Sequence, residues 1–215
     1  MMNRADELST VLSHVRWLGG GSGAGKTTIA ARLARRHGAI VYGSDETMGD
    51  HAERCPPNLC PRLAAFKRMS MDERWVRRAP QVMLETFHWY HGEAFDLIID
   101  DLCALPRDRP VIAEGFRLLP RLVAPLVRNR DRALWLLPTP AFRLAAFEAR
   151  GTTWDIPRRT SDPERALRNL LDRDAMFTER LRQDATALEL DTLTVDSSLC
   201  EDELLDLVDD RLFGR

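Results

Sequence analysis

The chain has 215 residues, of which 44% are hydrophobic, and its formal net charge is −2 at pH 7. A chain of this length can bury one sizeable core and is short for two, so we expect a single domain over residues 1–215. The near-neutral charge argues against a general nucleic-acid or membrane-surface binder, and no apolar stretch reaches a membrane-spanning length. The four scattered cysteines do not indicate a disulfide framework, and the N-terminal residues lack the apolar core of a signal peptide. These features predict a reduced, cytoplasmic protein.

Five short apolar runs have the length and composition of buried parallel strands, and each is followed by a turn or a helical pattern. They cover residues 15–18, 39–42, 110–113, 133–137 and 192–195. A helix is predicted over residues 26–36, with Gly38 as its C-cap. Strands that alternate with helices predict an α/β fold, here a three-layer αβα sandwich around a five-stranded parallel sheet.

Two connections between the predicted strands are longer than a crossover requires. The first, residues 46–108, should form a helical insertion, with a long helix beginning at Pro80. An amphipathic helix is predicted at the end of this insertion from the spacing of Phe95, Ile98, Ile99, Leu102 and Leu105. The second connection, residues 139–162, is rich in arginine and should act as a lid. It ends at a capping box, Ser161-Asp162-Pro163-Glu164, that opens a helix reaching about residue 188.

Residues 19–28 read GGGSGAGKTT and contain the complete Walker A pattern, Gly-x-x-x-x-Gly-Lys-Thr. Small residues let backbone N–H groups approach a triphosphate, and the following helix points its positive dipole end at the phosphates. Lys26 is expected to reach the β- and γ-phosphates, and the Thr27 hydroxyl to bind Mg²⁺. The pattern therefore predicts ATP binding. The residues expected to bind it are Gly20, Gly21, Ser22, Gly23, Ala24, Gly25, Lys26, Thr27 and Thr28.

Two acidic residues follow predicted strands, at the edge of the sheet where ligands bind in open α/β folds. Asp45 comes after the second strand, where it could orient or deprotonate an attacking hydroxyl, or simply cap the next helix. Glu114 ends the third strand and could hold the Mg²⁺ shell. Its rivals, Asp100 and Asp101, lie on the amphipathic helix, where acids usually form a solvated face. Arg117 could contact an acceptor or pair with a surface acid.

The arginines of the predicted lid could close over the phosphates and neutralise the charge in transfer. Arginine is so frequent in this chain that each one is individually more typical of a solvated surface residue. The candidates are Arg143, Arg150, Arg158 and Arg159, which Arg168 and Arg173 of the following helix could join.

Two further clusters lie in the insertion. Residues 87–91, Phe-His-Trp-Tyr-His, could wall an acceptor pocket or form the core of the insertion. His51, Cys55 and Cys60 could together bind zinc, but they lack a paired Cys-x-x-Cys and a fourth ligand, which argues against a metal there.

The loop GGGSGAGKTT, the aspartate of Gly43-Ser44-Asp45 and the arginine-rich segment after the fourth strand resemble the small P-loop kinases. The layout is most similar to chloramphenicol phosphotransferase and its relatives among the gluconate, shikimate and nucleotide kinases. The resemblance is strong over residues 12–46 and is one of layout beyond them. It implies that Asp45 positions or deprotonates the acceptor hydroxyl and that Arg143 and Arg150 stabilise the transferred phosphoryl group. The strand ending in Glu114 departs from the usual aspartate-ended pattern, which leaves its Mg²⁺ role open.

These features predict an ATP- and Mg²⁺-dependent kinase that transfers the γ-phosphoryl group to a hydroxyl of a small-molecule acceptor, as a monomer or homodimer. A nucleoside or nucleotide kinase is the nearest alternative. A phosphate-bearing acceptor would need a convergent set of arginines, and the insertion offers Arg62, Arg68, Arg74, Arg77 and Arg78. A nucleotide-binding regulatory module or slow NTPase is the third alternative.

Overall fold

The computed structural model, which describes residues 4–214, contains a five-stranded parallel sheet with the strand order β2-β3-β1-β4-β5. The strands are β1 (Val15–Gly20), β2 (Ile40–Gly43), β3 (Val111–Glu114), β4 (Ala133–Pro138) and β5 (Asp191–Val195). All five predicted strands are therefore confirmed, and their observed ends differ from the predicted ones by two residues or fewer.

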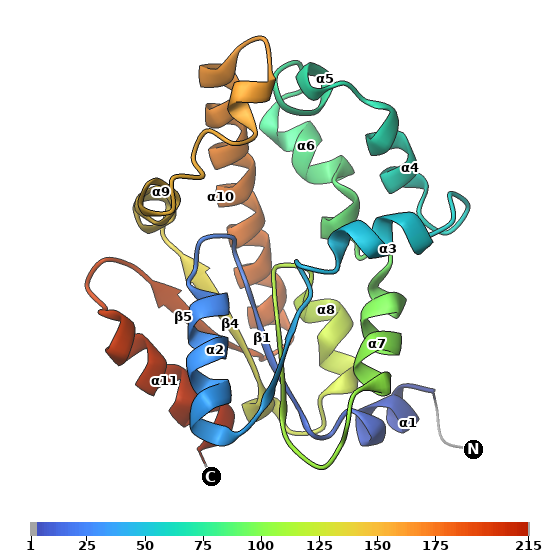
Figure 1. The fold of residues 1–215 in the computed structure, drawn as a ribbon, viewed down its shortest axis with the longest axis vertical. Coiled ribbons are helices and arrows are strands. Elements are labelled where there is room, and N and C mark those ends of the chain that lie inside the picture. Colours follow the sequence, from blue (N-terminus) through green and yellow to red (C-terminus); the bar gives the residue numbers. More distant parts are fainter. Residues whose placement is uncertain (1–3, 215) are drawn as a thin grey trace.

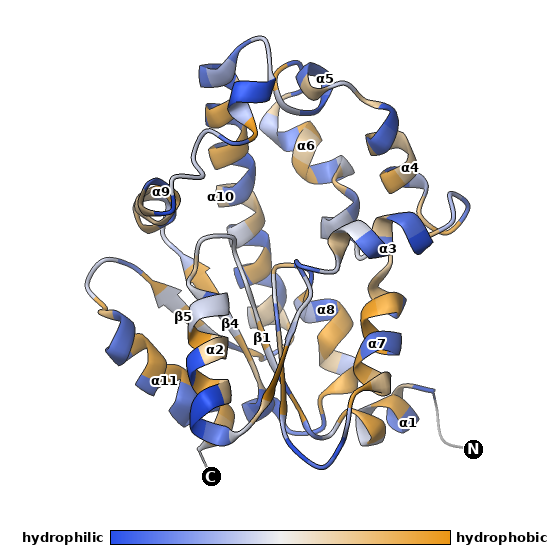
Figure 2. Cartoon of the chain, viewed as in Figure 1, coloured by the Kyte–Doolittle hydropathy of each residue, from blue (hydrophilic) through white to orange (hydrophobic). Residues whose placement is uncertain are grey.

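Helices cover both faces of this sheet, which confirms the predicted three-layer architecture (Figure 1). On one face lie α2 (Lys26–His37) and α11 (Glu201–Phe213). The other face is covered by α1 (Arg4–Val11), α7 (Phe95–Ala104), α8 (Pro120–Val123) and α10 (Pro163–Ala187). Figure 2 shows that the helices turn their hydrophobic residues towards the sheet and their hydrophilic residues outward.

The alternation of side chains along the central strands fills these two layers. In β1, Trp17 packs with the helices of the α7 and α10 face, and its neighbour Leu18 packs with α2 and α11. Trp135 and Leu136 of β4 divide in the same way. All four side chains are 1% exposed or less. Because a strand buried on both faces has no polar side, it reads in the sequence as a continuous apolar run.

Helix α2, which follows β1, begins at the predicted residue and ends one residue beyond the predicted end. Lys26 is the first residue of α2, and Gly38 follows the last residue with a left-handed φ of 62°. The N–H of Gly38 donates to the Ala34 carbonyl, so the glycine satisfies an acceptor that the end of the helix would leave free.

The connection between β2 and β3 consists of short helices. They are α3 (Met48–Arg54), α4 (Pro61–Arg68), α5 (Met71–Trp75), α6 (Pro80–Thr86), the 3-10 helix η1 (His88–His91) and α7. The amphipathic helix is confirmed as α7, with Ile98, Ile99 and Leu102 buried. The long helix predicted from Pro80 is wrong, because α6 ends at Thr86 and the chain turns so that Trp89 and Tyr90 enter the interior.

The connection between β3 and β4 holds α8, η2 (Ala124–Leu126) and η3 (Arg130–Arg132), and that between β4 and β5 holds α9 (Pro140–Ala149), η4 (Pro157–Arg159) and α10. The predicted helix ending near residue 188 is confirmed as α10, but its N-cap is Asp162, whose carboxylate accepts from the Arg165 N–H. Ser161, which the capping box required at that position, donates to Asp72 of α5 through both its N–H and its hydroxyl. The end of the predicted lid is thereby fastened to the insertion.

The prediction that the cysteines are reduced is wrong for two of them, because Cys55 and Cys60 form a disulfide. The turn through Pro56 and Pro57 brings their Cα atoms to 6.1 Å, within the range a disulfide spans. The cysteines therefore no longer support the prediction of a cytoplasmic protein. Across residues 4–214, no helix is both long enough and apolar enough to cross a membrane.

Candidate nucleotide and acceptor site

The Walker A loop lies at the carboxyl end of β1, between this strand and α2 (Figure 1). Gly20 has a φ of 131°, and a Cβ atom there would stand 2.1 Å from the Leu136 carbonyl oxygen. Gly23 and Gly25 both have a left-handed φ of 80°. These three backbone positions require glycine for steric reasons. The glycines therefore allow the loop to expose its N–H groups.

Lys26 begins α2 at the base of the loop, where it is only 5% exposed. Its ammonium donates to the Gly21 carbonyl oxygen at 2.9 Å, so the side chain lies back along the loop. Burial lowers the pKa of Lys26, while the carboxylates of Asp45 and Glu114 act to raise it. The structure thus brings together the three charged residues that the sequence placed at this edge of the sheet.

Glu114 is positioned by β3, which lies between β1 and β2; Gly43 and Leu18 pair with it on either side. Its Oε1 accepts from the Thr27 hydroxyl at 2.9 Å, and its buried Oε2 has no partner among residues 4–214. Burial raises the pKa of Glu114, and Lys26 opposes that shift. A carboxylate oxygen without a partner next to a hydroxyl fits Mg²⁺, which takes one or two protein oxygens together with water and phosphate.

Asp45 stands two residues beyond the end of β2, beside Glu114 and Lys26. Its Oδ1 accepts from the Phe116 N–H and from the Ser44 hydroxyl, each at 3.2 Å. Burial raises the pKa of Asp45, and Lys26 is the largest influence against that shift. The carboxylates of Asp45 and Glu114 therefore both interact with the Lys26 ammonium in a largely buried environment. Clusters of ionisable groups with shifted pKa values are typical of active sites.

Gly115 is a site residue that the sequence reasoning missed. Its φ is 140°, and a Cβ atom there would lie 2.0 Å from the Ser44 hydroxyl and 2.6 Å from Asp45 Oδ1. The turn after β3 can therefore approach Asp45 only because residue 115 is glycine. A glycine directly after the acidic end of a strand was the available signal.

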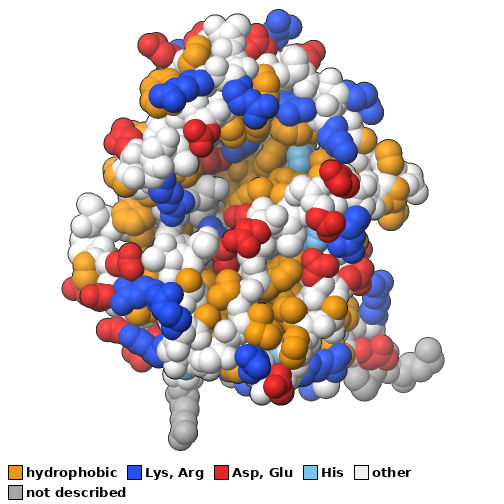
Figure 3. Space-filling model, in the orientation of Figure 1, with side chains coloured by type: hydrophobic (Ala, Val, Ile, Leu, Met, Phe, Trp, Pro, Cys, Tyr) orange, Lys and Arg blue, Asp and Glu red, His pale blue; other side chains and the backbone are white. Residues whose placement is uncertain are grey.

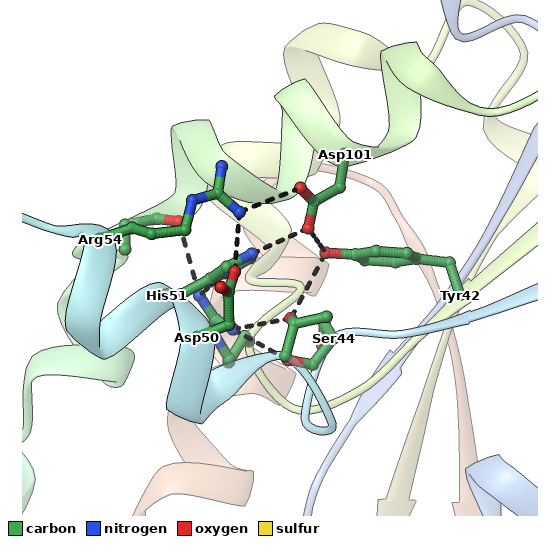
Figure 4. Close-up of polar contacts among 9 residues, drawn as sticks. Tyr42, Ser44, Asp50, His51, Arg54 and Asp101 are labelled. Atoms are coloured by element: carbon green, nitrogen blue, oxygen red, sulfur yellow. Dashed lines mark hydrogen bonds and ion pairs between the residues drawn. The ribbon is translucent and has the colours of Figure 1, made fainter.

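A buried polar network holds the turn that carries Asp45 (Figure 4). Arg117, only 2% exposed, donates to the Ser44 carbonyl oxygen at 2.8 Å and to Nδ1 of His51 at 2.9 Å. Since a guanidinium only donates, Nδ1 must accept, and the His51 proton is on Nε2, which donates to Asp101 at 2.8 Å. The Tyr42 hydroxyl donates to the same Asp101 oxygen at 2.8 Å.

This network corrects one interpretation of the sequence. Asp101 is half-buried and bonded within the network, although its neighbour Asp100 is exposed as predicted. The three residues considered for zinc are engaged elsewhere, because His51 is bonded to Arg117 and Asp101 while Cys55 and Cys60 form the disulfide. Arg117 also lies 4.2 Å from the centre of the Trp89 ring, and burial lowers the pKa of its guanidinium to about 10.

The arginines expected in the lid lie in different environments. Arg143 is 1% exposed on α9, where its Nε donates to the Ser22 carbonyl oxygen at 3.2 Å and its Nη2 donates to the Thr178 hydroxyl of α10. Arg143 therefore connects the Walker A loop to α10 and fixes its position. Arg150 follows the same helix and is exposed. Arg158 and Arg159 are exposed as well.

A cavity of about 270 Å³ adjoins the Walker A loop on the side of α11. Gly23, Gly25 and Thr28 line its floor, and Phe142, Arg150 and Leu204 are among the residues of its walls. A concave space with apolar walls beside a phosphate-binding loop has the shape and lining expected for the nucleoside part of a nucleotide.

In the insertion, the aromatic side chains form two buried hydrophobic clusters around Trp75 and Trp89. Figure 3 shows a hollow with hydrophobic walls and with both basic and acidic side chains on its rim. Phe66, Trp75, Phe87 and His88 pack edge to face or tilted against one another. His88 is 2% exposed, and burial together with Arg117, Arg74 and Arg173 lowers its pKa to about 3. The low pKa means that the His88 imidazole is neutral at pH 7.

The five insertion arginines considered for phosphate binding do not converge. Arg62, Arg68 and Arg77 are exposed. Arg74 donates to the carbonyl oxygens of Phe66 and Lys67, and Arg78 donates to the Thr86 hydroxyl.

A five-stranded parallel sheet with a glycine-rich loop between β1 and α2, and a buried lysine at the start of that helix, defines a P-loop protein. Residues 15–154 match the family model of the AAA domain. The match covers more than half of the chain, and the protein therefore belongs to this family. The resemblance to P-loop proteins is thereby confirmed. No protein of curated function matches the chain.

Two solved structures show the kind of molecule that this fold is similar to. The deoxyadenosine kinase from M. mycoides with bound dATP is 12% identical, with a TM-score of 0.49, covering 92% of this chain and 98% of that one. The shikimate kinase from Acinetobacter baumannii in complex with shikimate is 17% identical, with a TM-score of 0.43, covering 94% and 95% respectively.

Proposed function

We propose that this protein is a kinase that uses ATP and Mg²⁺ to transfer the γ-phosphoryl group to a hydroxyl of a small-molecule acceptor. The observation that supports this best is the placement of the Asp45 carboxylate beside Lys26 and Glu114 at the carboxyl ends of β1, β2 and β3. A second carboxylate beside the phosphate loop, held by the Phe116 N–H, is suited to receive the proton of an acceptor hydroxyl.

The residues divide the work of transfer among them. The Walker A loop and Lys26 hold the phosphates, with Arg143 fixing the loop through the Ser22 carbonyl oxygen. Thr27 and Glu114 would hold Mg²⁺, which supplies positive charge to the β- and γ-phosphate oxygens when bound. Asp45 accepts a hydrogen bond from the acceptor hydroxyl and takes its proton as the oxygen bonds to the γ-phosphorus and ADP leaves.

The same proposal assigns roles to the two long connections. Residues 46–108 form the acceptor side, because this connection follows Asp45 and lies beyond the carboxyl ends of the strands (Figure 1). Residues 139–162 act as the lid, with Arg150 next to the nucleotide cavity as the arginine best placed to reach the phosphates. We propose that the whole chain works as one domain, either as a monomer or as a homodimer.

The test is transfer to an unspecified acceptor. Purified protein with Mg-ATP and a filtered extract of small molecules is analysed by mass spectrometry, and the Lys26→Ala variant serves as the control. A compound that gains one phosphoryl group only with the active protein supports the proposal. ATP hydrolysis with no such compound supports a slow NTPase or regulatory module instead.

Asp45→Asn separates the role of Asp45 from nucleotide binding. The amide keeps the size of the side chain but cannot accept a proton, so we expect transfer to fall by about 10²–10⁴-fold while ATP affinity is retained. Near-normal transfer by this variant would refute the assigned role.

A further inference from the structure

A second cavity, of about 370 Å³, lies between the lid and α10, and its mouth is at Ser22 of the Walker A loop. Its walls are largely apolar, and they include Phe147, Ile156, Pro157, Leu167, Leu170 and Leu171. Its polar lining comes from Ser22, Thr152, Thr153, Asp155, Arg173 and Asp174. Apart from Ser22, which belongs to the Walker A loop, no step of the proposed transfer uses these polar groups.

Two of them are buried without a partner among residues 4–214. The Nη1 atom of Arg173 and the Oγ1 atom of Thr153 each lack a hydrogen bond, although the residues are only 7% and 9% exposed. A buried donor without a partner is unfavourable, so two such donors on residues that line one cavity are available to a ligand that enters it.

The Arg173 guanidinium is rigidly held. Its Nε and Nη2 both donate to Asp174 Oδ1, at 2.9 Å and 2.6 Å, and the Tyr90 hydroxyl donates to the same oxygen at 3.0 Å. The guanidinium carbon lies 4.9 Å from the centre of the Phe87 ring and 5.2 Å from that of Trp75. With its other nitrogens engaged, Nη1 is the donor left for a ligand.

Asp174 compensates the charge of Arg173 itself, because burial acts to lower the pKa of Arg173 while attraction to Asp174 raises it, with a net rise. The guanidiniums of Arg143 and Arg78 are also close enough to interact with Arg173 electrostatically. Asp155, the second acid of the cavity, is exposed. Two arginines beyond the Arg173–Asp174 pair favour an anionic ligand.

Helix α9 separates this cavity from the nucleotide cavity. Phe142, Ala146 and Arg150, spaced four residues apart on one face, line the nucleotide cavity, and Phe147 lines the second one. The Walker A loop contributes to both cavities, because Gly23 lines the nucleotide cavity and Ser22 lines the second one. A molecule in the second cavity would therefore meet the loop from the side opposite the nucleoside.

From this geometry we propose that the cavity beside Arg173 and Thr153 binds an anionic group of the acceptor, a carboxylate or a phosphate ester. The proposal rests on the proposed function and names its substrate class: an organic anion that carries a hydroxyl group and an apolar part. Arg173 Nη1 and the Thr153 hydroxyl donate to the anion, and the leucines of α10 contact the apolar part.

The test measures binding of simple probes, so that it does not depend on turnover. Benzoate and phenyl phosphate are titrated by calorimetry into the full-length protein, with uncharged benzamide as the comparison. We expect each anion to bind at least about tenfold more tightly than benzamide, because a charge-assisted hydrogen bond is stronger than a neutral one. Equal binding of all three probes would overturn the proposal.

Variants locate the binding. Arg173→Lys keeps the charge beside Asp174, and Thr153→Val keeps the shape of the side chain, so both should fold. Each should weaken anion binding by about threefold to tenfold, whereas Arg168→Gln, an exposed arginine of the same helix, should leave it unchanged. If both cavity variants bind the anions as the unmodified protein does, the assignment to this cavity is refuted.

A saturating ATP analogue distinguishes the two sources of an anion. If benzoate still binds in its presence, the site belongs to the acceptor, and if benzoate is displaced, the cavity takes a nucleotide phosphate and the proposal fails. Failure of the proposed function is separate, since it would show as selective anion binding without phosphoryl transfer to any compound of the extract.

Discussion

The nucleotide side of this site and its acceptor side differ in how the chain builds them. The nucleotide side is one continuous segment, in which the backbone of residues 20–27 makes the binding surface and small residues keep it open. The acceptor side is assembled from side chains of distant segments, such as Arg117, His51 and Asp101, which are 66 and 50 residues apart along the chain. A change in the first region should therefore act on nucleotide binding itself, and a change in the second should act on transfer alone.

The largest effect should follow from replacing Lys26 by methionine, which fills the same space without the charge. The Lys26 ammonium is buried beside two carboxylates, and it is bonded to the phosphate loop at the Gly21 carbonyl oxygen. We expect transfer to fall by about 10²–10³-fold, as when one preorganised donor is removed from a transition state, and ATP binding to weaken. Unchanged ATP affinity, measured by calorimetry, would contradict the difference between the two regions.

Gly115→Ala should be the most damaging change on the acceptor side. The added methyl group would collide with the Ser44 hydroxyl and displace Asp45, at a position whose φ of 140° is also unfavourable for alanine. We expect about a hundredfold loss of transfer, the size of effect that a misplaced catalytic group produces, with ATP affinity preserved.

Gly49→Ala is the matched control, because among residues 4–214 no atom outside its chain neighbours and its own helix backbone lies within 4 Å of where its Cβ would be. Equal activity of the two glycine variants would show that the contact between Gly115 and Asp45 has no role in transfer.

The two regions also differ in what could be predicted from the sequence. The Walker A loop, the five strands and Gly38 were predictable because each depends on residues adjacent in the chain. The network behind Asp45 could not be predicted. A buried Arg117 is stabilised by hydrogen bonds and charges from His51 and Asp101, which lie on two helices elsewhere in the sequence. The disulfide between Cys55 and Cys60 is a different case: it is local, and a count of the cysteines missed it because the count does not consider the turn through Pro56 and Pro57.

Asp101→Asn tests that network with a smaller expected effect. The amide can still accept from His51, but the negative charge opposite the His51–Arg117 pair is gone, so the turn that carries Asp45 should be held less firmly. We expect kcat to fall by about tenfold with KM for ATP unchanged, which a merely destabilised fold would not produce.

Asp100→Asn provides the comparison, since Asp100 is the exposed neighbour on the same helix. Equal kinetics for the two variants would exclude a positioning role for Asp101.

The smallest expected effect is on the stability of the fold, which should rise when Asp45 is replaced, whereas the changes above lower activity. Because burial raises the pKa of Asp45, the folded protein binds this proton more tightly than the unfolded chain does. The resulting stability is fully present below the unfolded pKa of about 3.9 and is lost as the pH rises through the folded pKa. At pH 7 the ionised Asp45 therefore destabilises the fold, and Asp45→Asn should increase the free energy of unfolding by about 1 kcal/mol.

Urea denaturation at pH 7 and at pH 4 measures this difference, which should shrink at the lower pH, where the wild-type carboxyl gains its proton. Glu46→Gln, a change in the exposed neighbour, should shift stability at neither pH. A less stable Asp45→Asn variant at pH 7 would mean that attraction to Lys26 outweighs the cost of burial. A more stable variant that cannot transfer phosphate would show that Asp45 is kept for its chemistry and at the expense of the fold.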